Sequence, residues 1–181
     1  RGQLRDLLAV LLDLLGAQYK MTARRKRPTT EAEPPRALAW HSVQLARHES
    51  RPTAIDYIGR IVTNFVELHG DRAHGDDPAL VTGLGHLGGQ TVVVIGQERG
   101  RVDEAVDRND GRTSPEGFRK AQRAIRLASK FRVPLLTLID TPGPLQSLDT
   151  EERGLGNSIA HTMSQMSALE APSIAVVIGE G

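Results

Sequence analysis

The sequence predicts an α/β fold in which buried, parallel strands alternate with helices. Near-continuous apolar segments over 133–139 and 174–178 are typical of strands in a sheet that is covered on both faces. Amphipathic segments with helical spacing lie before and between them. Strands that alternate with helices in this way are joined by right-handed crossovers, which make neighbouring strands parallel.

Composition excludes several classes of protein. The chain has 181 residues, of which 39% are hydrophobic, and a chain of this length buries roughly 70% of its unfolded surface, enough for one core. Its 23 Lys and Arg nearly balance 22 Asp and Glu, so no overall field draws it to nucleic acid or to a membrane. It has no apolar run of the ~18 residues that a membrane span needs, no signal-peptide pattern and no Cys. We therefore expect a cytoplasmic protein without disulfides or Cys-zinc sites.

The N-terminal part of the chain differs in kind from the rest. Leucines at helical spacing predict an amphipathic helix over 1–15. The basic tract Lys20–Arg27 and a Pro-rich stretch after it predict a linker over 16–38. The basic tract could bind a polyanion, although such runs are usually solvated. Because the chain starts at Arg1 rather than Met and stops at Gly181 after an apolar segment, we interpret it as a fragment of a longer protein.

A regular pattern begins after residue 51. A helix is predicted to start at Pro52 and to end at Gly70, with one apolar stripe formed by Ile58, Ile61, Val62, Phe65 and Leu68. A polar loop over 69–78 follows. Two strands are predicted next, over 80–84 and 91–95, with a Gly88-Gly89 turn between them. A helix that Ser114 caps and Pro115 starts leads to a strand over 133–139. A helix with the capping box Asp149 and Glu152 then leads to a strand over 174–178. The two later helices are predicted to bury Phe118, Ala121, Ile125 and Ala128, and Ile159, Met163, Met166 and Leu169.

Glycine marks the ends of the predicted strands. Of the 18 glycines, 15 lie between Gly70 and Gly181, and the strands end at Gly96, in the turn 140–143 and at 179–181. In open parallel sheets, ligands bind beyond the carboxyl ends of the strands. These glycines therefore predict one ligand-facing edge of the sheet.

Side-chain catalysts are not organised into a recognisable motif. The chain has no Gly-x-Ser-x-Gly nucleophile elbow, and its histidines are scattered. The densest polar group is His69, Asp71, His74, Asp76 and Asp77, which could bind a divalent metal. Without ordered ligand spacing, we interpret it instead as a loop whose Asp side chains cap backbone amides, and we expect no metal site.

Backbone amides are the remaining candidates for chemistry. A pair of N–H groups at a glycine turn can hold an oxyanion such as a thioester enolate. Glycine is needed there because a Cβ would block close approach. The candidates are the turn Thr141-Pro142-Gly143 and the segment Gly179-Glu180-Gly181.

Residues 51–181 resemble the alpha subunit of the carboxyltransferase component of bacterial acetyl-CoA carboxylase. The matching stretches are Asp56-Tyr-Ile58, Glu67-Leu-His-Gly-Asp-Arg72, Gly75-Asp-Asp-Pro78, Ser114-Pro-Glu-Gly-Phe-Arg-Lys-Ala121, Leu138-Ile-Asp-Thr-Pro-Gly143, Glu151-Glu-Arg-Gly154 and Val177-Ile-Gly-Glu-Gly181. Trp40–His48 is similar to the family's lead-in helix, and Arg1–Leu15 to the last helix of the partner beta subunit. The second likeness implies a parent protein that fuses the beta and alpha halves.

The resemblance implies a crotonase-like (ClpP/crotonase) spiral of ββα units, incomplete in this chain, with residues 39–181 as an alpha-type domain truncated at its C-terminal end. It also implies a transferase of fatty acid biosynthesis. Such enzymes move a carboxyl group from carboxybiotin, held on a separate carrier protein, to acetyl-CoA, and so make malonyl-CoA. The expected partners are the beta half, the biotin carboxyl carrier protein and biotin carboxylase, in an ATP-dependent complex that is a hetero-oligomer or a homodimer of a fused chain. Zinc is expected only on the beta subunit's ribbon.

The resemblance also implies roles for individual residues. Gly143, Gly179 and Gly181 would be catalytic through their backbone; Thr141, Pro142, Gly143, Pro144 and Leu145 would bind biotin; Arg101 and Arg153 would steer an anionic group. The chain departs from the family where Pro144-Leu-Gln-Ser147 replaces the usual Ala-Tyr-Pro-Gly, and where Leu155-Gly156 replaces Gln-Ser. Proline at 144 removes one backbone donor next to the expected biotin pocket.

Two other functions stay open from the sequence. One is a different crotonase-like acyl-CoA reaction, for which Glu98, Glu104 or Glu116 would be the acid or base. The other is a non-catalytic or regulatory carboxyltransferase-like subunit, which the departure at Pro144 favours. In every case, we expect residues 1–181 alone to be inactive.

Overall fold

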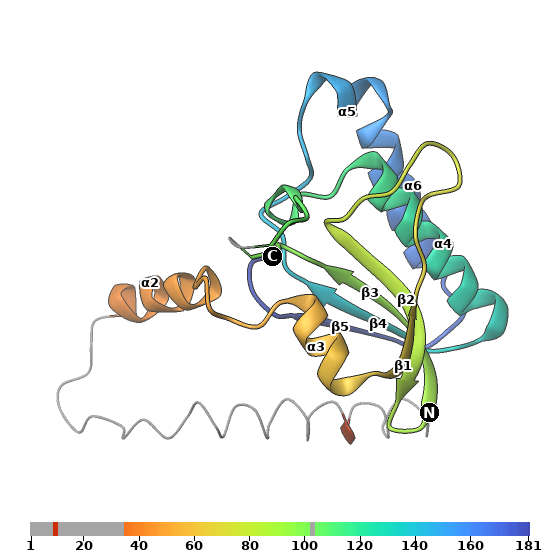
Figure 1. The fold of residues 1–181 in the computed structure, drawn as a ribbon, viewed down its shortest axis with the longest axis horizontal. Helices are drawn as coiled ribbons and strands as arrows, with labels where there is room; N and C mark the ends of the chain where they lie inside the picture. The colour runs from red at the N-terminus through yellow and green to blue at the C-terminus, as the bar shows by residue number, and fades with distance from the viewer. Residues whose placement is uncertain (1–8, 11–34, 102–103) are drawn as a thin grey trace.

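The computed structural model describes residues 9–10, 35–101 and 104–181. In this part of the chain, a five-stranded sheet in the order β1-β2-β3-β4-β5 has helices on both faces (Figure 1). Helix α3 covers one face, and α4 covers the other with α6 beside it. None of the helices described is both long and apolar enough to cross a membrane. The predicted helix over 1–15, apart from residues 9–10, and most of the predicted linker lie outside the described residues.

The sheet is mixed rather than wholly parallel. Its strands are β1 (Thr63–Glu67), β2 (Leu80–Leu87), β3 (Gln90–Gln97), β4 (Leu135–Ile139) and β5 (Ser173–Val177). The predicted parallel arrangement holds for β3, β4 and β5, but β1, β2 and β3 pair antiparallel. The reason is local, because Gly88 and Gly89 both have positive φ angles, 57° and 83°, and such a pair closes a two-residue hairpin.

Among the described helices, α4 agrees best with its sequence prediction. The helices are α2 (Pro35–Ala46), α3 (Ala54–Ile61), α4 (Pro115–Phe131), α5 (Leu148–Glu152) and α6 (Leu155–Ser167), with a 3₁₀ turn at Asn109–Gly111. Ser114 caps α4 by accepting a hydrogen bond from the Gly117 amide, and Pro115 is its first residue, as predicted. The α2 helix starts at Pro35, inside the predicted linker.

The predicted helix from Pro52 to Gly70 is wrong in its second half. The α3 helix ends at Ile61, and strand β1 begins at Thr63. Phe65 lies in this strand, half-buried over β2, where a Cβ added to Gly83 would lie 2.5 Å from its ring. The tertiary packing of Phe65 on a glycine of a neighbouring strand therefore overrides the helical spacing.

The last helix also differs from the prediction. Ser147, not Asp149, caps α5 together with Thr150, and the helix breaks at Gly154, whose φ angle is 79°. The predicted buried stripe is wrong at Met163 and Met166, which are 67% and 37% exposed, whereas Leu169 is half-buried against the apolar cluster of α4. The buried side chains of α6 are Leu155 and Ser158, and the face they occupy packs on α4 through hydrogen bonds from the Gln122 side chain to the Ser158 carbonyl and the Thr162 hydroxyl.

Two apolar clusters hold the sheet between its helices. Val92, Val94, Leu136 and Leu138 pack with Ala54 and Ile58 of α3, whereas Val93, Ile95 and Leu135 pack with the apolar side of α4. Burial on both faces explains the near-continuous apolar run of β4. The prediction of a second buried strand over 174–178 is wrong, because β5 is an edge strand whose residues alternate between exposed and half-buried, with Val177 61% exposed. Because β3, β4 and β5 are parallel, their carboxyl ends lie at one edge of the sheet.

Candidate functional site

The two glycine segments predicted to carry the chemistry lie side by side at this edge. The Thr141 amide donates to the Glu180 carbonyl over 2.8 Å, and the Glu180 amide donates to Asp140 Oδ1 over 3.1 Å. Two hydrogen bonds in opposite directions therefore join the turn after β4 to the segment after β5.

A buried ion pair supports this junction. Asp140 is 0% exposed. Its Oδ1 lies 2.6 Å from Arg51 Nη2, and its Oδ2 lies 2.6 Å from Arg51 Nη1. A Cβ added to Gly179 would lie 2.4 Å from Asp140 Oδ1 and 2.5 Å from Arg51 Cζ. Glycine at 179 is thus required by the close approach of the ion pair, independently of any ligand.

Glu180 lies between two arginines from different parts of the chain. Its carboxylate accepts hydrogen bonds from Arg47, just after α2, and from Arg99, just after β3. The Arg47 hydrogen bond is the largest influence on Glu180, and together with Arg99 it holds the pKa of this carboxyl below its usual range. The segment 179–181 is therefore held by the side chain of Glu180 as well as by its backbone hydrogen bonds.

Most amides of the turn are already used. The Gly143 amide donates to Thr141 Oγ1 over 3.0 Å, the Leu145 amide donates to the Thr113 carbonyl, and Pro142 and Pro144 have no N–H. By contrast, the amides of Gly179 and Gly181 donate to no residue that the structure describes. Of the predicted backbone donors, these two remain available to a ligand. Gly143 contributes an open Cα instead, since no atom lies within 4 Å of an added Cβ.

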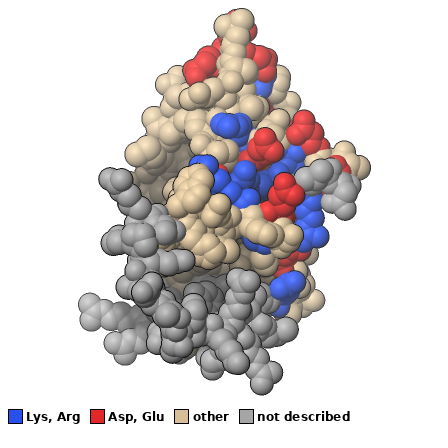
Figure 2. All heavy atoms as spheres, turned by 90° about the vertical axis from the view of Figure 1, so that its left-hand side faces the viewer, with Lys and Arg blue, Asp and Glu red and all other residues tan. Residues whose placement is uncertain are grey.

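Next to this edge is a hollow of about 560 Å³. It is lined by Arg47, Arg51, Arg99, Arg101 and Arg108 among others, and of the predicted site residues it contains Arg101 alone. Basic and acidic side chains gather together on the face drawn in Figure 2. Each of these arginines pairs with a carboxylate: Arg47 and Arg99 with Glu180, Arg51 with Asp140, Arg101 with Asp56 and Arg108 with Glu104.

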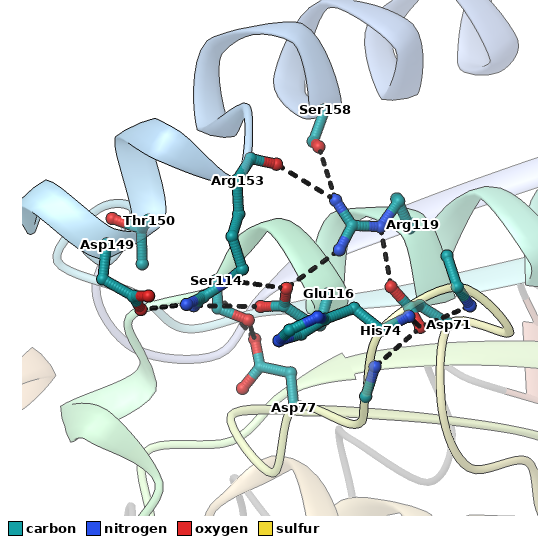
Figure 3. Close-up of polar contacts among 12 residues, drawn as sticks. Asp71, His74, Asp77, Ser114, Glu116, Arg119, Asp149, Thr150, Arg153 and Ser158 are labelled. Carbon is teal, nitrogen blue, oxygen red and sulfur yellow. Dashed lines mark hydrogen bonds and ion pairs between the residues drawn. The ribbon is translucent and has the colours of Figure 1, made fainter.

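A second polar cluster lies at the start of α4 (Figure 3). We call Asp71, Glu116, Arg119, Asp149 and Arg153 the carboxylate–arginine cluster. Glu116 Oε1 accepts from Arg119 and from Arg153, each over 2.9 Å, and Arg119 also donates to Asp71 over 2.7 Å. Burial would raise the pKa of Asp71, but hydrogen bonds from backbone amides and Arg119 outweigh it and hold this pKa far below its usual range. The pKa of Glu116 is lowered in the same way, against its burial, by amide, Ser114 and Arg153 hydrogen bonds.

The structure therefore separates the two arginines predicted to steer anions. Arg101 lines the hollow and is 56% exposed, with its guanidinium on Asp56. Arg153 lies in the carboxylate–arginine cluster, where Glu116 and Asp149 both accept from it.

Sequence reasoning missed Arg51 and Asp140 as a pair, and it missed Glu116 as an anchor. Asp140 and Glu116 both lie in stretches that resemble the carboxyltransferase family, and this resemblance was the only sequence evidence that could have drawn attention to them. The three glutamates considered as an acid or base are all engaged: Glu98 accepts from the Ile55 and Gly100 amides, Glu104 from Arg108, and Glu116 as above.

The polar loop 69–78 behaves as a capped loop. Asp71 Oδ1 accepts from the amides of Ala73, His74 and Gly75, and Asp77 accepts from Ser114. Among the residues described, no three His, Cys, Asp or Glu side chains are grouped as metal ligands.

The ion pair between Lys120 and Asp76 makes the folding stability depend on pH. Lys120 is 1% exposed and donates to Asp76 Oδ1 over 2.6 Å. Burial would raise the pKa of Asp76, but the hydrogen bond from Lys120 and others outweigh it and lower the pKa from 3.8 to about 2. A carboxyl with a lowered folded-state pKa stabilises above its unfolded pKa and loses this contribution as the pH falls through the folded value.

We therefore expect the free energy of unfolding to fall as the pH is lowered from about 4 to about 2. Asp76 should account for about 1 kcal/mol of this fall, because its side chain is 38% exposed and solvent weakens its interaction with Lys120. Urea unfolding of the native chain and of Asp76→Asn at both pH values checks this. The difference between the two proteins should shrink at the lower pH; a constant difference would contradict the prediction.

Solved structures share this architecture. A chain of transcarboxylase 12S, with hydrolysed methylmalonyl-coenzyme A bound, superposes with a TM-score of 0.61 at 23% identity, over 84% of this chain and 27% of that one. The beta subunit of Pseudomonas aeruginosa geranyl-CoA carboxylase gives 0.58 at 21% identity, over 71% of this chain and 25% of the other. The fold is thus the crotonase-like fold of carboxyltransferases, as the resemblance implied.

Sequence comparison defines the family more narrowly. Residues 18–181 match the family described as acetyl co-enzyme A carboxylase carboxyltransferase-like, and the chain belongs to that family. It is 52% identical over 143 residues to the acetyl-coenzyme A carboxylase carboxyl transferase subunit alpha of Teredinibacter turnerae, covering 78% of this chain and 45% of the relative. The subunit alpha of Treponema denticola is 47% identical over 171 residues, covering 94% and 54%. The chain spans about half the length of these relatives.

Proposed function

We propose that this chain forms part of the alpha half of a carboxyltransferase that moves a carboxyl group from carboxybiotin to acetyl-CoA and so gives malonyl-CoA. Membership of the family and the junction of two glycine segments at the sheet edge support this proposal. The observation that carries it is the pair of amides at Gly179 and Gly181, which donate to none of the described residues.

The chemistry assigned to the chain is electrostatic. Carboxybiotin, when bound, supplies the carboxyl group. The amides of Gly179 and Gly181 would donate hydrogen bonds to negative charge that develops during transfer, in a position fixed before the substrate arrives. Such preorganised donors need no titrating side chain, which agrees with the engaged state of Glu98, Glu104 and Glu116.

The turn after β4 would form the wall of the biotin pocket. Thr141 is held by its hydroxyl, which donates to the Gly111 carbonyl over 2.7 Å. Pro142 is exposed, Pro144 and Leu145 are half-buried, and Gly143 leaves an open space above its Cα. This wall offers apolar surface and no spare amide, so we propose that it shapes the pocket while 179–181 supplies the donors.

The partners follow from the same proposal. A beta carboxyltransferase half would bind the acyl-CoA, a biotin carboxyl carrier protein would deliver the carboxyl group, and biotin carboxylase would recharge the carrier in the cytoplasm. The curated relatives are named as subunits, which supports assembly with other chains. We propose zinc for the beta half alone.

A regulatory carboxyltransferase-like subunit is the second candidate. The use of every amide between 141 and 145 favours it, because a biotin pocket without spare donors on this wall would bind the ureido group less well. In that case, replacing Pro144 by alanine and Leu145 by tyrosine would raise transfer many-fold.

The test is an assay of a full-length protein that contains residues 1–181, assembled with a beta half and supplied with carboxybiotin and acetyl-CoA. We expect malonyl-CoA from the assembly and none from residues 1–181 alone. A folded, assembled protein that transfers nothing would reject the proposal. Turnover of an acyl-CoA without biotin would select the other crotonase-like chemistry instead.

A further inference from the structure

Between the biotin-pocket wall and α6, the chain makes an excursion away from the sheet. Residues 144–153 leave the edge, form α5 beyond the N-terminal end of α4 and then turn into α6 (Figure 1). Leu148, the first residue of α5, is 79% exposed. Helix α5 is therefore not held by burial of an apolar side chain of its own, and its buried residue is the polar Thr150.

Its attachments to the rest of the domain lie at its two ends. At the first end, the Leu145 amide donates to the Thr113 carbonyl over 2.9 Å. The Thr150 hydroxyl then donates to the Leu145 carbonyl over 2.8 Å, so that α5 is fastened to the start of the excursion. At the far end, Arg153 Nε donates to Glu116 Oε1 over 2.9 Å (Figure 3).

The far attachment has a rigid base. Glu116 lies in the first turn of α4, which packs on the sheet, and its side chain is 5% exposed. Arg119, from the next turn, donates to the same carboxylate oxygen and also approaches the Arg153 carbonyl at 3.4 Å. The backbone and side chain of Arg153 are thus both held by groups of α4.

Arg153 also pairs with Asp149, and the two pairs differ in burial. The Asp149 side chain is 71% exposed, against 5% for Glu116. An exposed ion pair contributes little, whereas removing one partner of a buried pair leaves an uncompensated charge. The buried contact is therefore the one expected to hold the excursion.

We propose that Glu116 is a positioning residue, whose buried carboxylate acts through Arg153 to fix where residues 144–153 lie against the sheet edge. Since the excursion begins at Pro144 and Leu145, Glu116 sets the wall that would face biotin. That last step rests on the proposed function, whereas the positioning itself does not.

The first test is hydrogen exchange of the full chain, measured for peptides that cover 144–153 in the native protein and in Glu116→Gln and Arg153→Met. We expect exchange of these peptides to be faster by about tenfold or more in both variants, with peptides from β3 and β4 unchanged. Asp149→Asn is the matched control, because it removes the exposed partner of the same guanidinium, and its exchange should stay within about twofold of the native value. Arg153→Met leaves Glu116 paired with Arg119, so it remains informative if Glu116→Gln folds poorly.

The second test is carboxyl transfer by the full-length assembly. A positioning role predicts that Arg153→Met raises the KM for carboxybiotin about tenfold while kcat changes by less than about threefold. Unchanged exchange of 144–153 in Arg153→Met, or an equal effect of Asp149→Asn, would overturn the inference. If exchange changes as expected but the native assembly transfers nothing, the positioning stands and the proposed function is rejected.

Discussion

Replacing Arg51 by methionine is expected to lower the free energy of unfolding by about 3–5 kcal/mol. The cause is Asp140, which is 0% exposed and would be left as a buried carboxylate without its cation. The change also removes the group that holds Asp140 in place as acceptor for the Glu180 amide. Urea unfolding of the native and variant chains at neutral pH measures the effect.

The control for Arg51→Met is Arg101→Met. Arg101 makes the same kind of contact, 2.6 Å from Asp56, but its side chain is 56% exposed. Exposed pairs of this kind contribute less than about 1 kcal/mol. Equal losses in the two variants would show that burial of the Arg51–Asp140 pair does not matter.

The second large effect is expected from Gly179→Ala. The new methyl group would lie 2.4 Å from Asp140 Oδ1 and 2.5 Å from Arg51 Cζ, so either the ion pair or the segment 179–181 must move. We expect about 1–3 kcal/mol of destabilisation from overpacking and about a hundredfold loss of carboxyl transfer in the full-length assembly, because one donor leaves its position. Unfolding and malonyl-CoA formation measure the two effects separately.

Gly59→Ala provides the comparison for Gly179→Ala. Gly59 lies in α3, and no atom is within 4 Å of an added Cβ. Alanine inside a helix stabilises by up to about 1 kcal/mol relative to glycine, and transfer should be unchanged. A Gly179→Ala assembly that transfers at the native rate would remove 179 from the proposed donors.

The sequence predicted best those features that depend on neighbouring residues. The cap at Ser114, the glycine turn at 88–89 and the buried run of β4 all follow from local chemistry, and each is present. The strand over 174–178 is present as well, but it is not buried on both faces, because it lies at the edge of the described sheet. The β1 strand could not be predicted in this way. Phe65 fits a helical stripe as well as a strand, and what decides is Gly83, on another strand.

The candidate site shows the same division. Glycine at the strand ends predicted that the turn 140–143 and the segment 179–181 would share an edge, and the Thr141–Glu180 hydrogen bond joins them. The buried anchors depend on partners far away in the sequence, namely Arg51 for Asp140 and Arg153 for Glu116. No spacing rule relates such residues, so charge alone gave no reason to pair them.

The pairing of the arginines around the hollow also bears on how molecules would approach it. The five arginines named there face four carboxylates of the same chain, because Arg47 and Arg99 share Glu180. Glu49, Asp107 and Asp110 also line the hollow, so its positive charge is balanced locally, and salt screens what remains beyond a Debye length of about 8–10 Å. The mouth of the hollow therefore exerts no long-range pull on an anion. Encounters there would proceed without electrostatic acceleration and with little response to ionic strength. Under the proposed function, delivery by a tethered carrier would then matter more than attraction from solution.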